Sequence, residues 1–313
     1  MITEKKGKIV KGLGGLYEML ISEEGGEVRR LVCRAKGALR RGEEKIAVGD
    51  EVIVRIDDSL PDGVVVSSVF PRKNLLIRPP VSNLDMIFIL FAAARPAPAL
   101  ETVDRLTAIA FHNGIAPIIV ITKADLDPAA ADRLAGIYRR TTMPVFVTSS
   151  AQRRGMAQLS DYLGQNLVQG RTAAFAGASG VGKSTLMNVL FPHLTLATSE
   201  ISKKIERGKH TTRHVELFPC APTPETGYLA DTPGFSLLDF ERFDFFGREE
   251  LLPAFPELLP YVGKCRYADC AHVKESAEEC AVARAAERRE IAASRLASYR
   301  ALYTILKAKE RQF

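Results

Sequence analysis

The sequence predicts a multidomain fold with an N-terminal all-β barrel, a central α/β domain and a mainly helical C-terminal domain. Three observations support this division. Five short β-like runs precede residue 71, a glycine-rich loop lies between a buried strand and a helix, and three cysteines and a histidine gather near the C-terminus. A chain of 313 residues can hold two or three domains, and we place them at 1–72, 73–235 and 236–313.

The first domain is predicted to be a small barrel. Its β-like runs are separated by Gly, Asp and charged turns and occupy 7–10, 16–21, 28–33, 51–56 and 64–70. Five short strands in about 70 residues favour an OB-fold, a barrel that commonly binds RNA. Because Tyr17 and Phe70 are its few aromatic residues, we expect contacts to the backbone of structured RNA rather than base stacking. A purely structural barrel is the alternative.

A phosphate-binding loop marks the central domain. The octapeptide Gly177-Ala178-Ser179-Gly180-Val181-Gly182-Lys183-Ser184 fits G-x-x-x-x-G-K-[ST], with Thr185 after it. A strand expected at 172–176 and a helix expected at 184–190 supply the setting that this motif requires. We expect backbone N–H groups to surround the phosphates, Lys183 to hold the β and γ phosphates, and Ser184 to bind Mg²⁺. A glycine-rich turn without a ligand is the alternative.

A second motif indicates which base the nucleotide carries. Thr122-Lys123-Ala124-Asp125 fits [NT]-K-x-D and follows a β-branched run at 116–121. Asp125 can accept hydrogen bonds from N1–H and the exocyclic amine of guanine, a pattern that adenine does not offer. The next expected strand, 144–148, ends in Ser149-Ser150-Ala151, where Ser150 and Ala151 are predicted to form a second guanine-contacting loop. The site is therefore predicted to select GTP.

These two motifs stand in reversed order. In ordinary small GTPases the phosphate loop precedes the guanine motif, whereas here the guanine motif comes first. The order predicts a circularly permuted P-loop GTPase domain. If the tetrapeptide at 122–125 is accidental, an ATP-using P-loop enzyme is the alternative.

The Mg²⁺ side of the site is predicted from D-x-x-G. Of three matches, Asp231-Thr232-Pro233-Gly234 alone follows an apolar strand beyond the phosphate loop, so Asp231 and Gly234 are assigned to the second switch. The run 201–214 lies between the phosphate loop and Asp231. It holds five cations and one acid and is predicted to be the first switch. Thr211 or Thr212 would then sense Mg²⁺ and the γ-phosphate, and the sequence leaves the choice open.

A metal site is predicted beyond the GTPase motifs. Cys265, Cys270, His272 and Cys280 supply three thiolates and one imidazole, the donor set of a closed, structural tetrahedral Zn²⁺ site. The alternative is a group of reduced thiols with an unrelated histidine. The apolar residues that follow recur at helical spacing and predict a packed helix: Ile291, Leu296, Tyr299, Leu302, Tyr303 and Leu306.

Composition limits which partners and which cellular location the protein can have. The net charge of +6 permits RNA binding, and the tail from residue 281 holds eight Lys and Arg against three Asp and Glu, although a charged surface helix explains the tail equally well. The sequence has no apolar run of signal-peptide type and none near 18 residues, so we expect a cytoplasmic protein without membrane partners. We separately expect a monomer, although the sequence does not reveal the oligomeric state. Five cysteines in such a chain argue against a disulfide framework.

Together the motifs resemble those of the bacterial ribosome small-subunit-dependent GTPase A family. The permuted order, the stretch Arg207-Gly208-Lys209-His210-Thr211-Thr212, the stretch Asp231-Thr232-Pro233-Gly234-Phe235 and the Cys/His cluster carry the resemblance over nearly the whole chain. In that family the interval from the His to the last Cys is two residues shorter, so the place of Cys280 among the ligands stays open.

The resemblance implies a GTP hydrolase that acts late in small-subunit assembly. It would bind the small ribosomal subunit and its rRNA in the GTP state and leave after hydrolysis. Phe235 stands where many GTPases carry a water-orienting Gln, which predicts a low intrinsic rate that the ribosome stimulates. His210 is the candidate catalytic residue that orients or deprotonates water, although it could instead contact RNA. An RNA-binding assembly factor that uses GTP as a bound switch, with little turnover, is the alternative.

Overall fold

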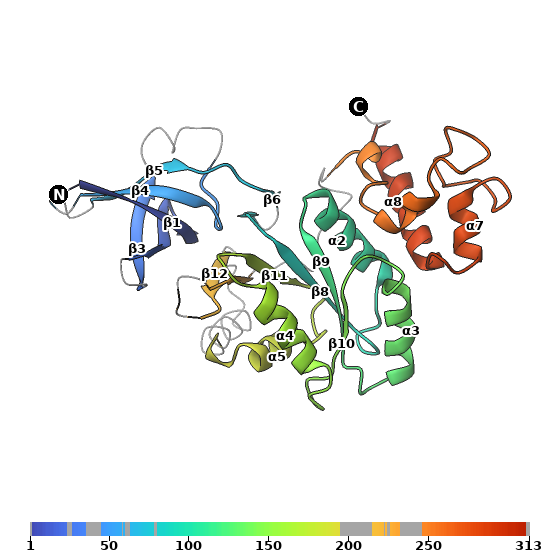
Figure 1. Ribbon diagram of the computed structural model, residues 1–313, viewed down its shortest axis with the longest axis horizontal. Helices are drawn as coiled ribbons and strands as arrows, with labels where there is room; N and C mark the ends of the chain where they lie inside the picture. Colours follow the sequence, from blue (N-terminus) through green and yellow to red (C-terminus); the bar gives the residue numbers. More distant parts are fainter. Residues whose placement is uncertain are drawn as a thin grey trace. The chain divides into compact units, whose positions relative to one another are not determined.

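The computed structural model describes residues 2–23, 27–35, 45–57, 59, 63–77, 80–194, 215–221, 223, 226–231 and 246–310 (Figure 1). It divides into two compact units. Met1–Met86, Ser160–Ala176 and Leu186–Ser236 form the first unit, and Ile87–Leu159, Gly177–Thr185 and Leu237–Phe313 form the second.

A five-stranded barrel begins the first unit. Its strands are β1 (Ile2–Leu13), β2 (Leu16–Ser22), β3 (Val28–Ala35), β4 (Glu51–Asp57) and β5 (Val64–Val69). Strand β1 pairs with both β2 and β4, and the parallel pairing of β3 with β5 completes the circuit. Alternate residues point inward, so that Ile9, Met19 and Val54 are fully buried in one core. All five predicted strands are confirmed.

The first unit holds five further strands. These are β6 (Leu75–Ile77), β7 (Pro80–Ser82), β11 (Thr172–Ala176), β12 (Glu216–Pro219) and β13 (Tyr228–Asp231). Strands β6 and β7 form a separate two-stranded sheet. The strand order β11-β13-β12-β1 joins the α/β strands to the barrel, with Lys11 of β1 opposite Glu216 of β12. Strands β11 and β13 run parallel, whereas β12 lies antiparallel to β13.

The second unit carries the other parallel strands and their helices. Strands β8 (Met86–Ala92), β9 (Ala116–Thr122) and β10 (Val145–Val147) lie in the order β10-β9-β8, with helices α2 (Leu100–His112) and α3 (Pro128–Tyr138) between them in the chain. Every residue of β8 is buried, which agrees with the near-continuous apolar composition of covered parallel sheets. Helix α4 (Met156–Asn166) follows β10.

The C-terminal part combines short turns with two helices. It contains the 3₁₀ segments η2 (Arg248–Glu250) and η3 (Pro256–Tyr261) and the helices α7 (Ala281–Glu287) and α8 (Ala293–Glu310). The predicted apolar stripe is buried from Ile291 to Leu306, with Tyr303 only half-buried. None of the helices within the described ranges is both long and apolar enough to cross a membrane.

A buried ionic cluster joins α8 to α2. The Arg295 guanidinium is fully buried and donates to Asp104 Oδ1 at 2.7 Å and to Glu257 Oε1 at 2.6 Å. Tyr138 and Ser298 also donate hydrogen bonds to Asp104. Burial alone would lower the pKa of Arg295, but the two carboxylates outweigh it and raise the pKa above its usual value. The C-terminal helix is therefore fixed to the α/β core by charge as well as by packing.

Lys8 forms a second polar link, within the first unit. Its side chain comes from β1 and donates to Gly170 O at 2.6 Å and to Thr172 Oγ1 at 3.2 Å, and its Nζ lies 4.9 Å from the centre of the Tyr228 ring. Burial lowers the pKa of Lys8 to about 8, because the charged ammonium loses its hydration there. The barrel is thus linked to the start of β11 and β13 by a nearly buried amine.

This burial predicts a pH dependence of stability. The pKa of Lys8 is about 8 when folded and 10.5 when unfolded, so between these values the unfolded chain binds more protons. We compare the free energy of unfolding of the unsubstituted protein with that of Lys8→Met. The difference should rise by roughly 3 kcal/mol as pH increases from 8 to 10.5, and it should not change with pH below 8. Denaturant titrations across pH measure this difference. An unchanging difference would contradict the assignment, and substitution of the exposed Lys307 of α8, Lys307→Met, serves as the control.

Candidate nucleotide and metal sites

The phosphate loop follows a fully buried strand. Strand β11 ends at Ala176, the loop spans 177–182, and helix α5 (Lys183–Leu190) begins at the motif lysine. Gly177 has φ +148°, and a Cβ there would lie 2.2 Å from Leu90 O, so only glycine fits beneath the loop. Gly180 and Gly182 also have positive φ values. The strand, loop and helix that the sequence predicted are all present.

Lys183 lies over this loop. Its Nζ donates to Gly177 O at 2.6 Å and to Ala178 O at 2.9 Å, and burial lowers its pKa. Ser184 and Thr185 are exposed in the first helical turn. The ammonium, the loop N–H groups and the positive end of α5 together make a local environment that suits phosphate.

The guanine motif is bound directly to the phosphate loop. Thr122, the last residue of β9, is 5% exposed and donates from Oγ1 to Val181 O at 2.5 Å. Lys123 has φ +55°, and its Nζ donates to Gly180 O at 2.7 Å and to Arg95 O at 2.8 Å. Two motifs more than fifty residues apart are therefore hydrogen-bonded to each other.

The second guanine loop lies beside the first. Ala124 N donates to Thr148 O at 3.1 Å, which holds the motif against the end of β10. Ser149 then closes a turn, with Gln152 N donating to its Oγ at 3.1 Å. Asp125 and Ser150 are half-buried on this edge, and Ala151 is exposed. The carboxylate that is expected to read the base is thus accessible at the C-terminal ends of parallel strands.

The Mg²⁺ side is described only in part. Strand β13 ends at Asp231, and its parallel register with β11, Ala174 opposite Ala230, places Asp231 near the C-terminal end of β11. The predicted residues His210, Thr211, Thr212 and Gly234 lie outside the described residues. Their roles therefore stay predictions.

Sequence reasoning did not identify Arg95 as part of this site. Its carbonyl accepts the second hydrogen bond of Lys123, so the segment after β8 helps to support the phosphate loop. Because a backbone carbonyl carries no residue-type signature, only the position of this segment after a buried strand could have indicated its role.

The four predicted metal ligands converge in the C-terminal part. The ligand atoms of Cys265, Cys270, His272 and Cys280 lie within 4.8 Å of one another. His272 Nδ1 is 3.5, 3.5 and 3.4 Å from the Sγ atoms of Cys265, Cys270 and Cys280, and the Cys265 and Cys280 sulfurs are 3.9 Å apart. A tetrahedral Zn²⁺ requires about 3.6 Å between sulfur and nitrogen and about 3.8 Å between sulfurs. The four donor atoms are close enough to share one metal ion, and Cys280 lies among them.

Hydrogen bonds orient the ligand loop. Ala281 N donates to Cys265 Sγ at 3.3 Å, and Ala283 N donates to Cys280 Sγ at 3.4 Å, contacts that favour thiolates. From α8, Tyr299 donates to Ala271 O at 3.1 Å and Arg300 Nε donates to His272 O at 3.0 Å. The long helix therefore supports the cluster from outside the ligand set.

Comparison with known proteins identifies the family. The RsgA GTPase family model matches residues 69–241, and the RsgA N-terminal domain model matches residues 6–65. The chain belongs to the RsgA GTPase family. Relatives named "Small ribosomal subunit biogenesis GTPase RsgA" include one from Alkaliphilus metalliredigens, 38% identical over 94% of this chain and 95% of the relative. Another, from Bacillus subtilis, is 36% identical over 98% of this chain and 99% of the relative.

Solved RsgA-like structures share the fold. YjeQ from Thermotoga maritima is 30% identical, with a TM-score of 0.77 over 97% of this chain and 99% of its own. YloQ, described as a circularly permuted GTPase, is 32% identical, with a TM-score of 0.76 over 98% of this chain and 96% of its own. The predicted family and fold class are thereby confirmed.

The metal cluster generates a prediction for Cys280. Cys280→Ser removes one thiolate, so we expect the Zn²⁺ affinity to fall by more than about a hundredfold, the upper range for loss of an outer-shell contact. Competition with a chromogenic chelator measures that affinity. Cys220→Ser, a half-buried thiol outside the cluster, should keep the affinity of the unsubstituted protein. Equal affinities for all three proteins would remove Cys280 from the ligand set.

Proposed function

We propose that this chain hydrolyses GTP and acts in biogenesis of the small ribosomal subunit. The observation that carries the proposal is the direct hydrogen bonding of the guanine motif to the phosphate loop, through Thr122 with Val181 and Lys123 with Gly180. The family and the printed names of its relatives support the same activity and the same process.

The residues of the phosphate site have separate tasks in this proposal. Lys183, now bonded to loop carbonyls, turns its ammonium to the β and γ phosphates when nucleotide binds. Ser184 and Asp231 would hold Mg²⁺, directly or through water, together with Thr211 or Thr212. The ion neutralises charge that develops on the phosphate oxygens. Residues 177–185 supply the loop N–H groups and the helix end that position the transferred phosphoryl group.

Base selection belongs to the guanine motif and its neighbouring loop. Asp125 accepts from N1–H and the exocyclic amine of guanine, while Ser150 and Ala151 line the loop beside it. Thr122 and Lys123 act on the same base indirectly, because they fix the motif to the phosphate loop. A nucleotide bound across both motifs is therefore held at its base and at its phosphates.

Water activation is assigned to His210, next to the proposed switch threonines. Since Phe235 replaces the glutamine that many GTPases use, the protein alone should hydrolyse GTP slowly. Binding to the small subunit would complete the site. Because hydrolysis then requires the small subunit, GTP is hydrolysed only on the correct partner, and the protein leaves after late assembly.

The other domains are assigned to anchoring and RNA contact. In this proposal residues 1–72 form an rRNA-binding OB-fold barrel, 73–235 the GTPase domain and 236–313 a helical domain held by one structural Zn²⁺. The four-ligand geometry leaves the metal no open position for substrate. We further propose a cytoplasmic monomer.

Turnover measurements test the proposed function. GTP hydrolysis by the purified protein should be slow alone and rise by at least about a hundredfold with purified small subunits, the order expected when a partner completes a GTPase site. Large subunits and ATP serve as controls. Absence of stimulation would contradict the proposal and favour the bound-switch alternative, and equal hydrolysis of ATP would favour an ATP-using enzyme.

Base selection gives a second prediction. In Asp125→Asn the new amide NH₂ would face the exocyclic amine of guanine, and two donors cannot form a hydrogen bond. Xanthine carries a carbonyl oxygen, O2, at that position, and this oxygen can accept a hydrogen bond from the amide. GDP affinity should fall by at least about a hundredfold, while affinity for xanthosine diphosphate should rise, because the site would then pair its polar atoms with the other base. Fluorescent nucleotide displacement measures both. Asp132→Asn, an exposed acid on α3, should change neither, and a variant at 125 that still prefers GDP would refute the assigned role.

A further inference from the structure

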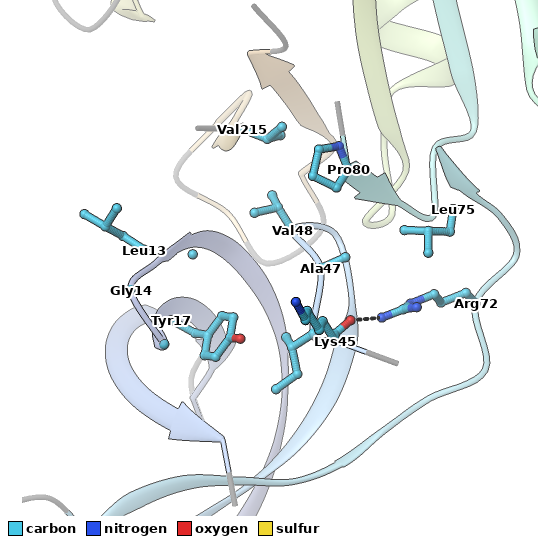
Figure 2. A pocket seen from close by; sticks show the side chains of 13 residues that line it. Leu13, Gly14, Tyr17, Lys45, Ala47, Val48, Arg72, Leu75, Pro80 and Val215 are labelled. Atoms are coloured by element: carbon cyan, nitrogen blue, oxygen red, sulfur yellow. Dashed lines mark hydrogen bonds between the residues drawn. The ribbon is translucent and has the colours of Figure 1, made fainter. Parts of the chain in front are cut away.

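A cavity of about 540 Å³ lies within the first unit, between the barrel and the start of β12. Figure 2 shows Leu13, Gly14 and Tyr17 of the β1–β2 hairpin on one side, with Val48, Pro80 and Val215 on the other. Lys45, Arg72 and Leu75 also line the cavity. The volume lies within the range of pockets that bind small organic groups.

The walls of this cavity suit a flat aromatic group. The Tyr17 ring is supported by Gly12, where an added Cβ would come within 3.2 Å of Cδ1. Val48 and Val215 form a buried apolar wall, while Leu13 at the hairpin is 54% exposed and Leu75 is 40% exposed. Gly14 and Gly15 have positive φ values and open space around their Cβ positions, so a ligand can approach the hairpin backbone closely.

The positive charge of the cavity lining suits a phosphate. Among the described residues of the barrel, most other cations form ion pairs with glutamates, such as Lys6 with Glu51 at 2.6 Å and Lys11 with Glu216 at 2.9 Å. Arg72 is likewise bound to the buried Asp50. Lys45 is exposed, and within the described ranges no carboxylate pairs with it. The lining holds no acid, and because Asp50 neutralises Arg72, Lys45 is the lining cation whose charge complements an anion.

We propose that this cavity binds an unpaired nucleotide of RNA, with its base between Tyr17 and the apolar wall and its phosphate at Lys45. A base provides the flat aromatic surface, and its 5′ phosphate provides the charge. Val215 precedes β12, whose Glu216 lies opposite Lys11 of the barrel, so a bound nucleotide touches the barrel and this strand together. The inference rests on the proposed function in taking RNA as the partner, and it adds the base-stacking contact that sequence composition disfavoured.

Binding of a fluorescein-labelled, single-stranded RNA of mixed sequence and about ten nucleotides tests this site, a length that one OB-fold accommodates. By fluorescence anisotropy, Leu13→Asp, Lys45→Glu and Tyr17→Leu should each weaken binding by about tenfold, the order of one lost stacking contact, whereas Tyr17→Phe should bind normally. Unlabelled duplex RNA of the same sequence should compete poorly, because its bases are paired.

Matched variants separate the cavity from general surface effects. Val32→Asp and Arg55→Glu introduce the same changes at exposed barrel positions outside the lining, and they should bind the probe within about threefold of the unsubstituted protein. GDP affinity and the far-ultraviolet circular dichroism spectrum, which should be unchanged in every variant, exclude misfolding, whereas Tyr17→Leu should lower the melting temperature because its ring packs against the barrel core. Equal losses in cavity and control variants, normal binding by the cavity variants, or equal competition by duplex RNA would each overturn the site. Such a failure leaves small-subunit stimulation of the unsubstituted protein intact, whereas failure of the proposed function abolishes that stimulation itself.

Discussion

The nucleotide site depends on the hydrogen bonds that join the guanine motif to the phosphate loop. Thr122 and Lys123 end one buried strand, and Val181 and Gly180 belong to the loop that follows another. Because both acceptors are backbone carbonyls, the contacts fix the path of the loop independently of its side chains. Circular permutation leaves this geometry intact, since it changes the order of the strands in the chain and not their position in the sheet.

Buried polar contacts also join the C-terminal helix to its neighbours. Within the second unit, Arg295 is enclosed by Asp104 and Glu257, and α8 continues to the metal loop through Tyr299 and Arg300. One helix therefore bonds both to α2 and to the loop that carries His272. A cluster of this kind specifies one docking geometry, because any other arrangement would leave a buried charge unpaired. The metal domain is thus attached to the α/β core through α2 as well as through the covalent chain after Asp231.

How much could be predicted from sequence depended on whether a feature is local. The barrel strands, the phosphate loop and the Asp125 motif each carry their signal within a few residues. Their existence and most of their bounds follow from the sequence, although β1 runs over Ile2–Leu13 and not only over 7–10. Cys280 remained open because its spacing is unusual; Arg266 N donates to Glu279 O at 2.7 Å, and this contact brings Cys280 beside Cys265. Arg295 with Asp104, the burial of Lys8 and the cavity at Tyr17 were not predictable, because each combines side chains from distant segments with no shared motif.

Equilibrium binding of guanine and adenine nucleotides to the purified protein tests the central claim most directly. Calorimetric titration with GDP, GTP and ATP in the presence of Mg²⁺ measures selection of the base apart from hydrolysis or any partner. The account predicts saturable binding of GDP and GTP at one site and binding of ATP at least about a hundredfold weaker, since adenine leaves the Asp125 carboxylate unpaired. Equal affinity for ATP and GTP would contradict it, because the joined motifs would then form a phosphate site that does not read the base.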